Sequence, residues 1–124
     1  MTSDPRPKLD DAIQSCEELS ADLPIIKSQS ENDFIHGLMT KQNAKYVWLG
    51  MQRNQSGFFW FDGSPAEKSR GALYNAWQEN ELQNRVNGRC AFLKLENRDW
   101  RVHRCYDVIE GYVLCQKGRD QDGP

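Results

Sequence analysis

The sequence predicts a single α+β domain, in which two helices pack on small antiparallel sheets. Apolar residues recur at helical spacing in the first third of the chain, and short apolar segments bounded by turn residues follow. Four cysteines without a close pair suggest a disulfide framework. At 124 residues the chain has the size of one domain and can bury one core.

The first helix is expected over about residues 8–19. One face of it would carry the apolar side chains of Leu9, Ala12, Ile13 and Cys16. A short apolar segment follows over 21–26. Its Pro24 indicates an edge strand or a crossover, because proline has no N–H to donate to a central ladder.

A second helix is expected over about residues 31–41. Ser28 followed by Glu31 is a capping box, in which two side chains satisfy the unpaired amides of a helix start. The apolar face of this helix is expected to consist of Phe34, Ile35, Leu38 and Met39.

The rest of the chain alternates apolar segments with turn residues. Residues 63–89 contain three glycines and a proline without sustained periodicity, which predicts a long loop region. Such a loop is rare in a compact domain unless it is functional or disordered, and the aromatics Tyr74 and Trp77 favour a packed, functional loop. Strands are expected at 46–51, 58–62, 90–95, 99–104 and 111–116.

The cysteines at 16, 90, 105 and 115 could bind zinc or form disulfides. Zinc sites usually contain close pairs such as Cys-x-x-Cys, and this chain has none. An even count without such pairs favours two disulfides and an oxidising, extracellular compartment. Four cysteines allow three connectivities, and spacing alone leaves all three open.

Charge is distributed unevenly along the chain. Residues 1–33 hold eight acidic and three basic side chains, whereas residues 85–104 hold six basic and two acidic ones. A basic segment in an acidic protein suggests an anionic ligand, although a solvated surface with scattered ion pairs explains it equally well. The basic residues of that segment are Arg85, Arg89, Lys94, Arg98, Arg101 and Arg104.

Several motifs recur in an order and spacing that resemble the C-type lectin-like domain over about residues 9–116. They are Leu9, Ala12 and Cys16 along the first helix, Ser28, Glu31, Phe34 and Ile35 in the second, Trp48-Leu49-Gly50-Met51, Trp60-Phe61-Asp62-Gly63, Trp77, and Trp100 with the last three cysteines. The resemblance implies an N-terminal extension at 1–7, a C-type lectin-like domain at 8–116 and a flexible tail at 117–124.

The same resemblance implies disulfides Cys16–Cys115 and Cys90–Cys105. The first would close nearly the whole chain into a loop and should stabilise it by about 4 kcal/mol. Family members usually begin with a strand that pairs with the C-terminal strand, and here only seven residues with two prolines precede the first helix. A missing strand would expose the edge near Tyr112 and favour a homodimer.

The calcium site of sugar-binding family members is degraded in this sequence. Calcium needs six to eight oxygen ligands, several of them carboxylates. The family's Glu-Pro-Asn motif is replaced by Glu81-Leu82-Gln83, its acid before the cysteine falls near Gly88-Arg89, and its Asn-Asp pair becomes Arg101-Val102. One carboxylate beside a guanidinium predicts no calcium at this position, and no other cofactor is expected.

Two functions remain, both extracellular. In the first, the domain recognises a protein or an anionic glycan without calcium, through the long loop and the basic segment 85–104. The side chains expected to contact that ligand are Arg89, Trp100, Arg101, His103 and Arg104, although a core role suits Trp100 better. In the second, a neutral sugar is bound without metal by Asn80, Glu81, Gln83 and Asn84.

Other classes of function are disfavoured. Neither histidine has a serine or free cysteine in a catalytic arrangement, so we expect no enzyme. The acidic chain lacks a known nucleic-acid-binding module, and no apolar run approaches the length of a membrane helix. Asn54-Gln55-Ser56 is a candidate glycosylation sequon in a predicted loop.

Overall fold

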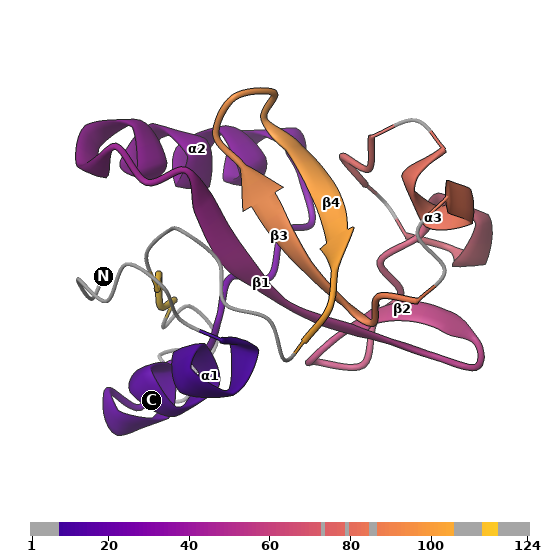
Figure 1. Ribbon diagram of the computed structural model, residues 1–124, viewed down its shortest axis with the longest axis horizontal. Helices are drawn as coiled ribbons and strands as arrows, with labels where there is room; N and C mark the ends of the chain where they lie inside the picture. Colours follow the sequence, from indigo (N-terminus) through magenta and orange to yellow (C-terminus); the bar gives the residue numbers. More distant parts are fainter. Residues whose placement is uncertain (1–7, 73, 79, 85–86, 106–112, 117–124) are drawn as a thin grey trace.

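The structure is a computed structural model that describes residues 8–72, 74–78, 80–84, 87–105 and 113–116. Its four strands form one antiparallel sheet in the order β2-β1-β3-β4 (Figure 1). The predicted α+β class with two main helices is confirmed. In chain order the elements are α1 (Leu9–Glu18), α2 (Gln29–Gln42), β1 (Tyr46–Asn54), β2 (Gly57–Trp60), the 3-10 helix η1 (Lys68–Arg70), α3 (Glu81–Asn84), β3 (Cys90–Lys94) and β4 (Asp99–His103).

The sheet separates two apolar cores. Successive side chains of a strand point to opposite faces, so neighbouring residues of β1 enter different cores. Val47 and Leu49 pack with Ile35 and Met39 of α2, whereas Trp48 packs in the core that holds α1. Figure 1 shows α1 and α2 on either side of β1.

Helix α1 matches the predicted helix within one residue at each end, and it buries Leu9, Ala12 and Cys16. Both disulfides expected from the family resemblance are confirmed. Cys16 bonds to Cys115, which ties α1 to the end of the chain, and Cys90 bonds to Cys105.

Helix α2 begins two residues earlier than predicted, and its cap differs in one bond. The Ser28 hydroxyl accepts the backbone N–H of Glu31 at 3.2 Å, as expected. The Glu31 carboxylate accepts the N–H of Lys27 at 2.7 Å rather than that of Ser28. Phe34 is 66% exposed, so its predicted place on the buried face is wrong. The buried stripe of α2 is centred on Ile35 and Met39. Successive residues of a helix are about 100° apart around its axis, so Phe34, which precedes Ile35, lies at the margin of that stripe.

The strands are close to their predicted positions, with two differences. β1 continues to Asn54 because its last four residues pair with β2, which begins at Gly57. Of the strand predicted at 111–116, the described residues 113–116 form only an isolated bridge between Gln116 and Asp22. The edge near Tyr112, on which the expected homodimer rests, lies outside the described residues.

The crossover expected over 21–26 is held close to β1. The Gly50 N–H donates to the Pro24 carbonyl at 2.8 Å, and a Cβ on Gly50 would lie 3.1 Å from the Leu23 carbonyl oxygen. A side chain at this position would push the crossover away from the sheet. Within the described ranges, no helix has the length and apolar character needed to cross a bilayer.

Candidate functional site

The long loop region covers the outer edge of β4. The Trp100 N–H donates to the Ala76 carbonyl at 2.8 Å, and the Gln78 N–H donates to the Trp100 carbonyl at 3.3 Å. The Trp77 indole packs edge-on against that of Trp100, with the ring centroids 5.5 Å apart. Its Nε1–H donates to the Ala66 carbonyl at 2.9 Å. The loop is therefore packed where it is described, as its aromatics indicated.

Trp100 is a core residue and has no exposed surface. Its indole Nε1–H donates to Asn32 Oδ1 at 2.9 Å, and the rings of Trp60, Tyr74 and Trp77 pack around it. The expectation that Trp100 contacts a ligand is wrong, because the fold leaves no face of its ring accessible.

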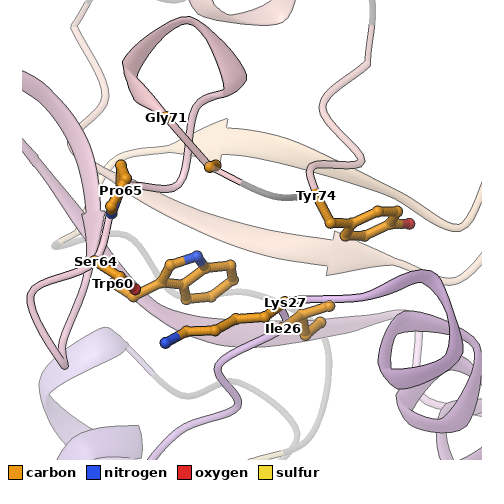
Figure 2. A pocket seen from close by; sticks show the side chains of 8 residues that line it. Ile26, Lys27, Trp60, Ser64, Pro65, Gly71 and Tyr74 are labelled. Atoms are coloured by element: carbon orange, nitrogen blue, oxygen red, sulfur yellow. The ribbon is translucent and has the colours of Figure 1, made fainter.

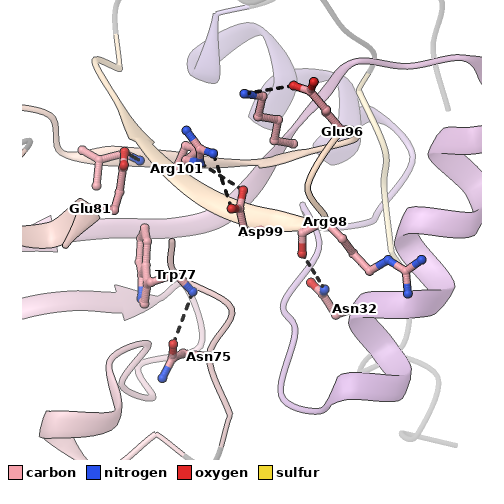
Figure 3. A network of polar contacts seen from close by, with 10 residues as sticks. Asn32, Asn75, Trp77, Glu81, Glu96, Arg98, Asp99 and Arg101 are labelled. Carbon is pink, nitrogen blue, oxygen red and sulfur yellow. Dashed lines mark hydrogen bonds and ion pairs between the residues drawn. The ribbon is translucent and has the colours of Figure 1, made fainter. Parts of the chain in front are cut away.

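Glu81 is also buried, with 5% of its surface exposed. It lies in the first turn of α3, where Figure 3 labels it. Its Oε2 accepts the backbone N–H of Val102 at 2.8 Å. This bond satisfies a donor at the outer edge of β4 that no strand pairs. This bond and the burial of Glu81 disagree with its expected contact with a sugar.

Arg101 is held by an acid of its own strand. Its Nε lies 3.0 Å from Asp99 Oδ1 and a terminal nitrogen lies 3.4 Å from Asp99 Oδ2 (Figure 3). The two residues are two apart in β4, so their side chains share one face. Much of the positive charge expected from Arg101 is therefore balanced locally.

The basic segment 85–104 does not form one surface. Arg98 lies in the β3–β4 turn and pairs with Asp33 at 3.0 Å, while Lys94 pairs with Glu96 at 3.4 Å. Arg89 and Arg104 lie at the other end of the two strands, in a groove of about 540 Å³. We call this the arginine groove, and its described lining residues are Asp10, Gln52, Arg53, Asn87, Arg89, Arg104 and Cys105.

Of the three arginines in the groove, Arg53 is the one that sequence reasoning missed. Its guanidinium lies 4.7 Å from the centre of the Phe58 ring and donates to the Leu82 carbonyl at 3.3 Å. Burial lowers the pKa of Arg53, the carboxylate of Glu67 raises it, and the positive charge of Arg89 lowers it again. The fold thus places a carboxylate and a second guanidinium within electrostatic range of Arg53, and the carboxylate has the larger effect of the two.

A second cavity lies between the crossover and the long loop, where Trp60 and Tyr74 line it. Figure 2 shows the Lys27 side chain alongside the Trp60 indole and the Tyr74 hydroxyl pointing away from it. The cavity has a volume of about 110 Å³, well below the 300 Å³ or more of typical small-molecule sites. Trp60 is only 3% exposed, so this cavity is a packing gap rather than a ligand site.

Comparison with known proteins decides the family. Residues 6–117 match the family model described as the lectin C-type domain. This chain belongs to the C-type lectin domain family. It is 31% identical over 109 residues to C-type lectin domain family 4 member M of Symphalangus syndactylus, which covers 86% of this chain and 24% of the relative. It is 28% identical over 109 residues to the CD209 antigen of Nomascus concolor, covering 86% and 25%.

Solved structures of the same fold agree with this assignment. The carbohydrate-recognition domain of cow CD23 matches with a TM-score of 0.72 and 23% identity, covering 91% of this chain and 82% of that one. That of the human scavenger receptor C-type lectin matches with a TM-score of 0.71 and 23% identity, covering 86% and 81%. The chain spans about a quarter of the length of the curated relatives it matches. As a C-type lectin domain, it is a non-enzymatic binding module.

The other expected contacts have varied surroundings in this C-type lectin domain. Asn80 is exposed and has a positive φ of 66°. His103 is half-buried, with its ring 5.3 Å from that of Phe92 and 5.9 Å from that of Trp48. The backbones of Gln83 and Asn84 belong to α3, and their side chains lie outside what the structure describes. Asn54 of the sequon is exposed, and its Oδ1 accepts the Ser56 N–H at 2.7 Å. Their roles stay predictions.

The described carboxylates near the family's calcium position have protein partners. Calcium needs several carboxylate oxygens converging on one point. Glu81 directs its carboxylate to the β4 backbone, and Asp99 is paired with Arg101. Within the described part of the chain, no group of three or more histidine, cysteine or acidic residues is arranged to hold a metal.

Proposed function

We propose that this C-type lectin domain is an extracellular, calcium-independent recognition module that binds a protein or an anionic glycan. The observation that carries the proposal is the hydrogen bond from the Val102 N–H to the buried Glu81 carboxylate at 2.8 Å. The bond holds Oε2 against the backbone of β4, so a metal would compete for this carboxylate, and loss of the bond would leave a buried N–H unpaired at a cost of about 1–3 kcal/mol.

Charge supports the anionic ligand. Arginine presents a planar fork of donors that matches carboxylate and sulfate oxygens, and Arg89 and Arg104 are both exposed at the mouth of the groove. The related cow CD23 domain has been solved in the presence of a GlcNAc2Man3 oligosaccharide, which supports a glycan as the ligand of this fold. The two disulfides support an oxidising, extracellular location.

A glycan array probed in excess chelator and again in millimolar calcium tests the proposal. We expect the same bound glycans in both conditions, and we expect them to carry sulfate or carboxylate groups. Binding that appears only with calcium, on neutral sugars, would refute it. Binding of neutral sugars in chelator would retain calcium independence and contradict the anionic ligand.

A further inference from the structure

The backbone positions the arginines of the arginine groove, so the groove is more than a patch of basic side chains on the surface. We propose that it is a subsite for a sulfated glycan, in which Arg53, Arg89 and Arg104 bind one sulfate group. The inference deepens the proposed function, because it names the ligand class and places it at one end of the sheet.

The backbone holds the three arginines together. Arg89 and Arg104 each precede a half-cystine, and the Cys90–Cys105 disulfide joins those cysteines with a Cα–Cα distance of 5.2 Å. The Arg53 N–H donates to the Arg89 carbonyl at 2.8 Å. The backbones of the three residues are therefore fixed relative to one another before any ligand arrives, which lowers part of the entropy cost of binding.

Charge in the groove is out of balance. Its described lining carries three guanidinium groups and one carboxylate, that of Asp10. Repulsion by Arg89 lowers the pKa of Arg53, although burial, which also lowers it, and the Glu67 carboxylate, which raises it, have larger effects. An anion bound between Arg53 and Arg89 would offset this repulsion. The loss of repulsion and the new charge-assisted hydrogen bonds would both contribute to the binding energy.

The shape and chemistry of the lining favour a glycan over a peptide. Apart from the half-cystine Cys105, every described lining residue is polar, and the amides of Gln52 and Asn87 can bond hydroxyl groups. Peptide sites usually need buried apolar anchors, which this lining does not present in its described part. A volume of about 540 Å³ lies within the range of small-ligand sites. An oligosaccharide with a sulfate ester fits this combination best.

Gly88 brings the groove close to β4. A Cβ on Gly88 would lie 2.5 Å from Val102 Cγ1 and 3.0 Å from the His103 carbonyl oxygen. Only a residue without a side chain allows this approach, so Arg89 is set against the sheet rather than in a freely moving loop.

Isothermal titration with a heparin-derived tetrasaccharide, in excess chelator and at fixed salt, tests the proposal. We expect Arg89→Gln and Arg104→Gln each to raise Kd about tenfold or more, because each removes charge-assisted bonds to the sulfate. Arg98→Gln is the matched control, because it removes the same charge from the same segment at the other end of the sheet. We expect it to change Kd less than twofold. Asp10→Asn should lower Kd, because it removes the groove's described carboxylate.

The outcomes separate this inference from the proposed function. Equal weakening by Arg98→Gln and Arg89→Gln would overturn the subsite and leave calcium-independent anion binding intact. Equal affinity for an unsulfated hyaluronan fragment of the same length would overturn the choice of sulfate. Binding of a sulfotyrosine peptide but not of the tetrasaccharide would overturn the glycan. Binding that requires calcium would overturn the proposed function itself.

Discussion

By the family resemblance Glu81 corresponds to a metal ligand, yet its carboxylate bonds to the backbone. Its side chain is 5% exposed and accepts the Val102 N–H at 2.8 Å. A single residue thus ties the long loop to the edge strand. Its partner is 21 residues away, so nothing in the local sequence indicated the bond.

We expect Glu81→Ala to lower the free energy of unfolding by about 2 kcal/mol, because it leaves the Val102 N–H buried without an acceptor. Glu81→Gln should cost less, because its amide oxygen can still accept. Urea unfolding measures both. Glu96→Ala is the control, since Glu96 is 76% exposed in a surface ion pair and should change stability by less than about 1 kcal/mol. Equal effects of Glu81→Ala and Glu96→Ala would contradict the structural role.

Asp62 is a second carboxylate whose role depends on its partners. It accepts bonds from Lys27 Nζ at 2.6 Å, from the Ser64 N–H at 2.9 Å and from the Ser64 hydroxyl at 2.6 Å. Burial raises the pKa of Asp62, but the hydrogen bonds from Lys27 and Ser64 outweigh burial and lower the pKa from 3.8 to about 2. The ionised form is therefore favoured in the folded state.

A lowered pKa gives stability that is present above the unfolded pKa and lost as pH falls through the folded one. We expect Asp62→Asn to lower the free energy of unfolding by about 1 kcal/mol at neutral pH, a value reduced because Lys27 is half exposed to solvent. The difference from the wild type should shrink between pH 4 and 2, where Asp62 becomes protonated. Thermal unfolding across this pH range measures it, and an undiminished difference at pH 2 would contradict the assignment.

At the scale of elements, close backbone approach sets the position of the arginine groove. Gly88 lies against β4, where a Cβ would meet Val102 Cγ1 at 2.5 Å. Gly37, in the middle of α2, has nothing within 4 Å of a Cβ. The two glycines therefore respond to the same substitution in opposite ways.

We expect Gly88→Ala to lower the free energy of unfolding by about 1–3 kcal/mol through overpacking. Gly37→Ala should raise it by about 0.5–1 kcal/mol, since alanine is the better helix former. Chemical denaturation of the two variants beside the wild type is the measurement. A Gly88→Ala protein as stable as Gly37→Ala would show that the segment before β3 does not contact β4 this closely.

The elements themselves were largely predictable. Leu9, Ala12 and Cys16 show a helical period, and Ser28 is the N-cap of the second helix, although that helix was predicted to begin two residues later than it does. Periodicity could not assign Phe34, because an apolar residue at the margin of a stripe looks the same in sequence whether it is buried or exposed. Only packing, which leaves Phe34 66% exposed, decides between the two.

The site was less predictable, because it depends on contacts between distant segments. The family resemblance supplied the Cys90–Cys105 pair, and with it the proximity of Arg89 and Arg104. Arg53 joins them through the β1–β3 pairing, whose register shifts between Trp48 and Gln52. No local signal marks such a shift, so counting along the strands could not place Arg53 beside Arg89.

At the scale of the whole molecule, the domain keeps the C-type lectin framework, and Glu81 bonds to the backbone of β4. Hydrogen bonds from the long loop and the Cys90–Cys105 disulfide hold β4 in place. A ligand that binds only the folded state raises the unfolding temperature, and calcium is such a ligand wherever a real site exists. The stability of this domain should therefore be independent of calcium.

Thermal unfolding of the wild type in millimolar calcium and in excess chelator tests this claim most directly. We expect the same unfolding midpoint in calcium and in chelator, both for the wild type and for Glu81→Gln. If calcium raised the midpoint of the wild type but not that of Glu81→Gln, an ion would bind at Glu81, which would contradict calcium independence.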